Sequence, residues 1–109
     1  MVYTGTHDTP TFIQWLREGD PDSVLYAHRY LRLREDEGFC WGAISGAWAA
    51  GSRLAIAPFQ DILGLGADAR MNTPGTLGAH NWSWRADPGF ATDALAQKIK
   101  TITLRYGRV

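Results

Sequence analysis

The stretch that decides the fold is MVYTGTHDTP, residues 1–10. The β-branched and aromatic residues of segment 1–6 predict a short strand. Thr9 and Pro10 then predict the start of a helix, with Thr9 as the N-cap and Pro10 at the first helical position. A His-Asp pair, His7-Asp8, lies between these two elements, so the pattern places both side chains at the end of a strand.

The residues that follow predict three helices. The first begins at Pro10 and stops near Gly19, and the second covers residues 23–36 after an Asp-Pro-Asp turn. His28 falls on the apolar stripe of the second helix, where packing or hydrogen bonding in the core is the favoured interpretation over ligand binding. The third helix, residues 38–51, is rich in Gly and Ala, which predicts that another segment approaches it closely.

Beyond these helices the pattern changes to a strand, a long loop and a final helix. Residues 53–57 form an apolar run without polar alternation, typical of a strand buried on both faces in a parallel sheet. Residues 59–91 carry almost no periodicity beyond short helical turns near 61–65 and 67–70. Loops of this length are usually functional or disordered, and the aromatic residues here argue against disorder. The last helix, 92–106, has an apolar stripe made of Leu95, Ile99, Ile102 and Tyr106.

The order of elements is a βα–βα pattern, which implies parallel strands. Two parallel strands are few for a stable sheet, so the pattern predicts that neighbouring strands are missing. An unpaired, apolar sheet edge invites self-association, which we therefore expect.

Composition narrows the class of protein. The chain has 109 residues, 45% of them hydrophobic and 20% charged, which fits a globular domain or part of one. Eleven basic and eleven acidic residues cancel, so no charge excess indicates nucleic acid or an anionic membrane as a partner. A single cysteine, Cys40, excludes an internal disulfide and a thiolate metal cage. With neither a signal peptide nor an apolar span visible, a cytoplasmic location is expected.

Three segments, taken together and in this order, resemble the C-terminal part of the 4-α-glucanotransferases, the amylomaltase or disproportionating-enzyme family. They are YTGTHDTPT (residues 3–11), PFQDILGLGADARMNTPGT (58–76) and NWSWR (81–85). The resemblance implies an α/β fold: the C-terminal βα–βα portion of a (β/α)8 TIM-type barrel, helix-rich with two short parallel strands. It also implies that residues 1–109 form a single partial domain with an active-site loop at 59–91.

The resemblance further implies an activity, the retaining transfer of α-1,4-glucan segments between maltodextrins, with no cofactor and no metal. Such transfer needs a nucleophile carboxylate and an acid/base carboxylate, and no stretch of this sequence matches the family motifs for either. By the motif match Asp8 is the third carboxylate, which stabilises the transition state, and His7 donates a hydrogen bond to the sugar in the same subsite. The isolated chain is therefore expected to be inactive.

The same resemblance implies a set of substrate-binding residues besides His7, namely Asn72, Pro74, Gly75, Asn81, Trp82 and Trp84. The two tryptophans are either stacking platforms for sugar rings or anchors of the loop. Arg70 and Asp61 are expected to be structural and to pair with each other under the loop. Where many family members have Asn after the His-Asp pair, this chain has Thr9, so any contact of that Asn side chain is in doubt.

Two other interpretations remain open. One is a free-standing carbohydrate-binding module that uses the aromatic loop, although binding alone gives no reason for a His-Asp pair at a strand end. The other is a truncated reading frame without a function of its own. In either enzyme or binding module the expected partners are α-1,4-glucans.

Overall fold

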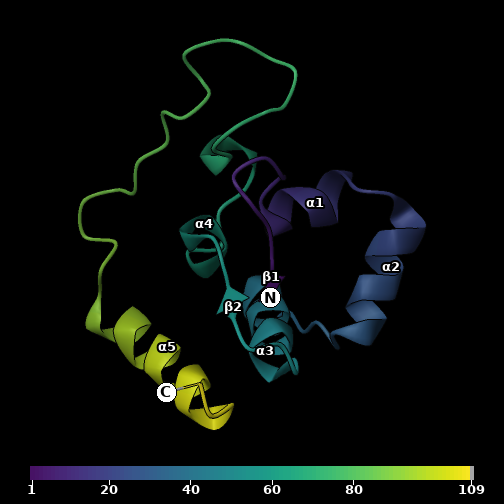
Figure 1. Ribbon diagram of the computed structural model, residues 1–109, viewed down its shortest axis with the longest axis vertical. Coiled ribbons are helices and arrows are strands. Elements are labelled where there is room, and N and C mark those ends of the chain that lie inside the picture. The colour runs from purple at the N-terminus through teal and green to yellow at the C-terminus, as the bar shows by residue number, and fades with distance from the viewer. Residues whose placement is uncertain (109) are drawn as a thin grey trace.

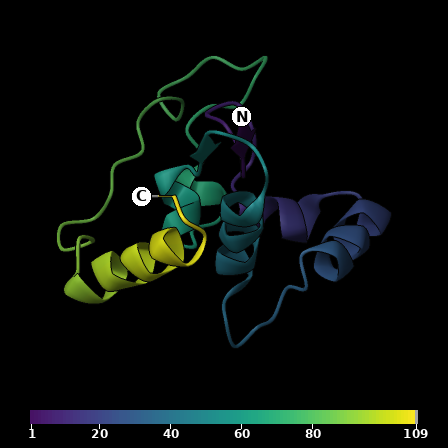
Figure 2. The same ribbon diagram turned by 60° about the horizontal axis from the view of Figure 1, so that its bottom comes forward.

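The computed structural model describes residues 1–108 as two short strands and a set of helices (Figure 1). In chain order the elements are β1 (Val2–Tyr3), α1 (Phe12–Glu18), α2 (Pro21–Tyr30), α3 (Phe39–Ala49), β2 (Ala55–Ile56), α4 (Phe59–Ile62), the 3₁₀ turn η1 (Ala67–Ala69) and α5 (Asp93–Arg105). The segment between η1 and α5 runs as a wide arc at the periphery in both views (Figures 1 and 2). No helix within residues 1–108 is long and apolar enough to cross a membrane.

The strands β1 and β2 pair in parallel, as the βα–βα order predicted, with Val2 opposite Ala55 and Tyr3 opposite Ile56. The predicted burial of the second strand on both faces is wrong, because Leu54 is 54% exposed and Ile56 44% exposed. Within residues 1–108 the sheet has only these two strands, and β2 contacts α3. One helix cannot cover both faces of a strand, so its apolar side chains remain partly in solvent.

Helix α1 begins later than predicted. Its N-cap is Thr11, whose hydroxyl accepts a hydrogen bond from the Gln14 amide at 3.2 Å, and Gly19 ends the helix as expected. Thr9 is not the cap because its hydroxyl is already used in a turn, where it accepts from the Thr6 amide at 2.8 Å. Pro10 therefore lies between this turn and the helix, which begins at Phe12.

Helix α2 is shorter than the predicted 23–36 and begins earlier. Asp20 is its N-cap and accepts from the Ser23 amide at 3.0 Å, with Pro21 in the first turn. None of its residues is buried, so the predicted stripe is only partly covered. His28 is half-buried, with its ring edge-on to Phe39 at 5.2 Å, which fits the packing interpretation.

Helix α3 is the centre of the fold and contacts α1, α4, α5 and β2. Its small residues allow close approach, as predicted: a Cβ atom on Gly42 would lie 2.6 Å from Leu33, and one on Gly46 would lie 2.6 Å from Leu31. The segment after α2 therefore packs directly against the backbone of α3.

Helix α5 matches its predicted bounds, with Thr92 as its N-cap, and it packs beside α3 (Figure 2). The four residues of the predicted stripe are all buried or half-buried, and Thr103 beside them is half-buried as well. Beyond the helix, the Arg108 guanidinium donates to the carbonyls of Trp48, Ala50 and Ser52 at 2.8–2.9 Å. These bonds satisfy carbonyls at the end of α3 and fix α5 to it.

Candidate functional site

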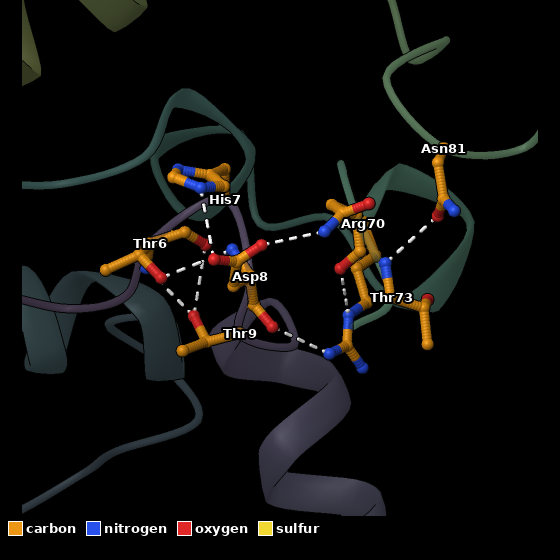
Figure 3. Close-up of polar contacts among 8 residues, drawn as sticks. Thr6, His7, Asp8, Thr9, Arg70, Thr73 and Asn81 are labelled. Atoms are coloured by element: carbon orange, nitrogen blue, oxygen red, sulfur yellow. Dashed lines mark hydrogen bonds and ion pairs between the residues drawn. The ribbon is translucent and has the colours of Figure 1, made fainter. Parts of the chain in front are cut away.

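The His7-Asp8 pair lies in the loop between β1 and α1, at the carboxyl end of the strand (Figure 3). Two threonines shape this loop. Thr9 donates from its hydroxyl to the Thr6 carbonyl at 3.1 Å, and the Thr6 hydroxyl accepts from the Asp8 amide at 3.2 Å. These bonds form a tight turn over residues 6–9. The turn directs the Asp8 side chain toward the segment after η1 (Figure 3).

The Asp8 carboxylate is held by one partner on each oxygen. Its Oδ1 accepts from the Asn72 side-chain amide at 2.7 Å, and its Oδ2 lies 3.1 Å from His7 Nε2. The Asp8 side chain is still 50% exposed and that of His7 56% exposed. A carboxylate offers about four lone-pair sites, so Asp8 keeps the capacity to accept hydrogen bonds from a ligand.

The segment after η1 is hydrogen-bonded to backbone carbonyls of the same loop. Arg70 donates from Nη2 to the Asp8 carbonyl and from Nε to the Asn72 carbonyl, both at 2.9 Å. The Asn72 amide donates to the His7 carbonyl at 3.1 Å. The strand-end loop and the long loop therefore form one structure, and Asp8 is fixed at both its backbone and its side chain.

The predicted pairing of Arg70 with Asp61 is wrong, although the contacts of both are structural as expected. Asp61 instead accepts from the Thr4 hydroxyl at 2.6 Å and from the Phe12 amide at 2.8 Å. Arg70 is occupied by backbone carbonyls, as described above. The sequence places both residues near the loop. It does not show which groups are their hydrogen-bond partners.

A tight turn follows Asn72. The Thr76 amide donates to the Thr73 carbonyl at 3.2 Å, and Gly75 has a φ of 80°, a left-handed value that favours glycine. Asn81 closes the turn, because its Oδ1 accepts from the Thr73 amide at 3.0 Å and its Nδ2 donates to the Thr76 carbonyl at 3.1 Å. In this structure the Asn81 amide thus holds the loop, and Pro74 lies exposed on the turn.

Trp82 lies against the His-Asp pair. Its ring centroid is 5.0 Å from that of His7, with the planes tilted by 38°, and the residue is 62% exposed. Its backbone has a φ of 61°, unusual for a bulky residue, and its amide donates to the Met71 carbonyl at 2.6 Å. Trp84 is half-buried further along the loop. The two tryptophans therefore differ, since only Trp82 presents an open ring beside His7.

A cavity of about 290 Å³ adjoins this cluster, and its wall includes His7, Asp61, Arg70, Met71, Trp82 and the loop residues around Thr6, whereas Asp8 lies beside the cavity and does not line it. Within residues 1–108 no group of three or more His, Cys, Asp or Glu side chains could hold a metal ion. The arrangement thus combines a held carboxylate, an imidazole and an exposed indole face, which suits a polar ligand with apolar ring faces.

The sequence-based prediction that Asp8, Asn81 and Trp82 share one end of the parallel strands is confirmed. Asn72 and Trp82 contact the His-Asp pair directly, and Asn81 supports the turn next to them. Sequence reasoning missed the Arg70 bond to the Asp8 backbone and the Asp61 bonds to Thr4 and Phe12. The only available signal was that both residues lie within the family-like segment 58–76.

Comparisons with known proteins agree with this architecture. A family model described as 4-alpha-glucanotransferase matches residues 1–91. A 4-alpha-glucanotransferase of Clostridium butyricum is 44% identical over 109 residues, covering 99% of this chain and 22% of that protein. One of a Synechocystis strain is 45% identical over 108 residues, covering 99% of this chain and 21% of that protein. The chain thus spans about a fifth of the length of the curated relatives it matches.

The fold has a similar solved structure. An amylomaltase from Streptococcus agalactiae in complex with acarbose superimposes with a TM-score of 0.90 and 31% sequence identity, covering 98% of this chain and 22% of that one. The chain therefore has the fold of the corresponding part of a (β/α)8 barrel, with two short parallel strands among many helices.

Proposed function

Because this chain belongs to the 4-alpha-glucanotransferase family, we propose that it supplies one section of the catalytic site of such an enzyme. The reaction is the retaining transfer of α-1,4-glucan segments between maltodextrins, through a covalent glycosyl-enzyme intermediate. Residues 1–109 then belong to a single barrel domain, and 59–91 is the loop that lines its active site. Asp8 stabilises the transition state, whereas the nucleophile and the acid/base carboxylate come from other parts of that barrel.

The single observation that carries the proposal is the state of the Asp8 carboxylate at the strand end. It is held by Asn72 and His7 and remains half exposed. Positive charge develops on the sugar ring in an oxocarbenium-like transition state, and a fixed negative charge is worth most where the opposite charge develops. Active sites of such barrels lie at the carboxyl ends of the strands, where Asp8 is found.

The other substrate-binding residues divide into two groups in this proposal. His7 and Trp82 face the sugar, His7 through hydrogen bonding and Trp82 through its exposed ring. Asn72, Pro74, Gly75 and Asn81 shape the turn that borders the groove, and Trp84 anchors the loop. The half-buried position of Trp84 and the bonds that occupy Asn81 support this division. The partners are α-1,4-glucans, and we keep a cytoplasmic location as part of the proposal.

The test is Asp8→Asn in the full-length protein that contains this sequence, assayed with maltotriose for glucose and longer products. The amide keeps the shape but removes the charge, so kcat should fall roughly a hundred- to a thousand-fold, with maltodextrin binding weakened much less. The same change at Asp22, an exposed aspartate in the first turn of α2 and outside both the cluster and the loop 59–91, should leave kcat unaltered. Unchanged turnover in Asp8→Asn would refute the role assigned to Asp8.

A carbohydrate-binding module remains the second candidate, favoured by the exposed Trp82 ring beside His7. The isolated 109 residues discriminate between the two. We expect no glucan transfer from them, since Asp8 alone can neither attack the anomeric carbon nor protonate the leaving oxygen. Tight maltodextrin binding by the chain alone, lost in Trp82→Ala, would support the module instead.

A further inference from the structure

Asp61 is a buried carboxylate with no part in the proposed chemistry. It lies on α4 and is only 1% exposed, the most buried charged residue of residues 1–108. Burying a carboxylate is costly unless its oxygens receive hydrogen bonds. Here each oxygen has a donor from elsewhere in the chain: Phe12 N to Oδ1 at 2.8 Å and Thr4 Oγ1 to Oδ2 at 2.6 Å.

The two donors stand at opposite ends of the loop that carries the His-Asp pair. Thr4 follows β1 directly, and Phe12 is the first residue of α1. One carboxylate on a third element therefore ties together the point where the loop leaves the strand and the point where it enters the helix. The residues between them, 5–11, include both His7 and Asp8.

We propose that Asp61 is a positioning residue for Asp8. Asp61 acts by holding together the two ends of the loop 5–11, at Thr4 and Phe12. The inference rests on the proposed function for its effect on turnover, but not for its effect on the loop. Asp61 belongs to the wall of the 290 Å³ cavity, but it is almost fully buried and each of its oxygens already accepts a hydrogen bond from the chain, so we assign it no bond to the sugar. It acts through Thr4 and Phe12 only.

The remaining contacts of the loop show why holding its two ends together affects the position of Asp8. Arg70 and Asn72 hold Asp8 from the side of the long loop, through a carbonyl and a carboxylate oxygen. These contacts fix Asp8 relative to residues 70–72 but not relative to the sheet. Thr4 is held to the sheet by its own amide, which donates to the Ile56 carbonyl in β2 at 3.2 Å. The Asp61 bonds join the start of α1, at Phe12, to this sheet-bound residue and so supply the second reference. A shift of about 1 Å in a catalytic group can cost on the order of a hundred-fold in rate.

The test begins with Thr4→Val, which removes one donor while it keeps the size of the side chain and the Phe12 bond. In the full-length protein that contains this sequence, hydrogen exchange of the Thr6, Asp8 and Thr9 amides, which are hydrogen-bonded within the loop, should quicken at least about ten-fold, as expected for local opening of a less tightly held loop. The matched control is Thr103→Val, which deletes a single bond from Trp48 at 3.3 Å between α3 and α5. It should leave exchange in residues 5–11 unchanged.

In the full-length protein, Thr4→Val should lower kcat roughly ten- to a hundred-fold with little change in KM, because Asp8 is displaced rather than removed. Thr4→Ser, which retains the hydroxyl, should restore most of the rate, and Thr103→Val should not alter it. Asp61→Asn should show the same defect more strongly. If that variant fails to fold, the threonine series still decides the matter.

Two outcomes would overturn the inference. One is wild-type exchange over residues 5–11 together with wild-type kcat in Thr4→Val, and the other is an equal loss in Thr4→Ser and Thr4→Val. A failure of the proposed function looks different. The full-length wild-type protein would then transfer no glucan, while the exchange experiment would still report whether Asp61 closes the loop.

Discussion

At the scale of single residues, two carboxylates near the strand-end loop show how exposure decides what a side chain can do. Asp8 is half exposed and keeps unused lone pairs, so it can meet a ligand. Asp61 is buried and bonded on both oxygens, so it can only organise the chain around it. The sequence contains both as ordinary aspartates, and only the tertiary contacts separate their roles.

Cys40 provides a pH prediction at this scale. Burial, together with the nearby negative charge of Asp61, raises the pKa of the Cys40 thiol from 9.0 to about 12. The neutral thiol is favoured in the folded state, so its contribution to stability is complete below pH 9 and is lost as the pH rises toward 12. Between pH 8 and pH 10.5 the free energy of unfolding should fall by up to about 2 kcal/mol.

The measurement is urea unfolding at both pH values for the wild type and Cys40→Ala. The alanine variant lacks the thiol, so its stability should fall less over the same interval, whatever the tyrosines and lysines contribute. Equal pH dependence of the two proteins would contradict the assignment.

Trp82 provides a second residue-scale prediction, because its φ of 61° is strained for any residue with a Cβ atom. We expect Trp82→Gly to be more stable than Trp82→Ala by about 1 kcal/mol. Both variants lose the ring next to His7, so the difference reports the backbone alone. Denaturant titrations of the pair measure it, and an alanine variant at least as stable as the glycine one would refute the strain.

At the scale of elements, prediction from sequence succeeded where the signal is local. Helix α5 was predicted almost to the residue, because its stripe and its Thr92 cap lie within one segment. The start of α1 was missed because the Thr9 hydroxyl bonds to Thr6, a choice that cap preferences cannot reveal. The Asp61 contacts were missed because they join residues 49 and 57 positions apart.

The end of α2 gives the element-scale prediction. Arg32 follows the helix with a φ of 52°, and the next amide, Leu33, bonds back to the His28 carbonyl at 3.0 Å. Glycine is the preferred residue at such a helix end. Arg32→Gly should therefore raise the free energy of unfolding by up to about 1 kcal/mol, after the entropic cost of glycine is subtracted.

A matched variant separates conformation from charge. Arg29→Gly removes the same side chain three positions earlier, inside α2, and should destabilise the chain by about 1 kcal/mol. Thermal or urea unfolding of the two variants should thus show changes of opposite sign. Losses of the same size in both would mean that the charge, not the backbone, matters.

At the scale of the whole molecule, the small sheet leaves large apolar side chains in solvent. Tyr3, Leu54 and Ile56 are each between 44% and 54% exposed, and within residues 1–108 the two strands pair only with each other. Apolar groups next to unpaired strand edges promote association. We keep the sequence-based expectation of self-association as a prediction for this 109-residue chain.

Sedimentation velocity over a range of concentrations tests it. The wild type should form larger species as its concentration rises, and Ile56→Lys should reduce them by placing a charge on the exposed strand. Leu77→Lys is the control, because Leu77 is 99% exposed but lies in the peripheral loop, away from the sheet. A monomeric wild type, or equal effects of both substitutions, would argue against association through the sheet.

The distance along the chain between the His-Asp loop and its supports has a consequence for biosynthesis. The Thr4–Asp61 and Asp8–Asn72 bonds span 57 and 64 residues. At translation rates of roughly 5–20 residues per second, the loop leaves the ribosome seconds before its partners have been made. Contacts of such long range also form slowly. The nascent loop therefore lacks its hydrogen-bond partners for this time. Any chaperone that shields it must release it only after residue 72 has emerged from the ribosome.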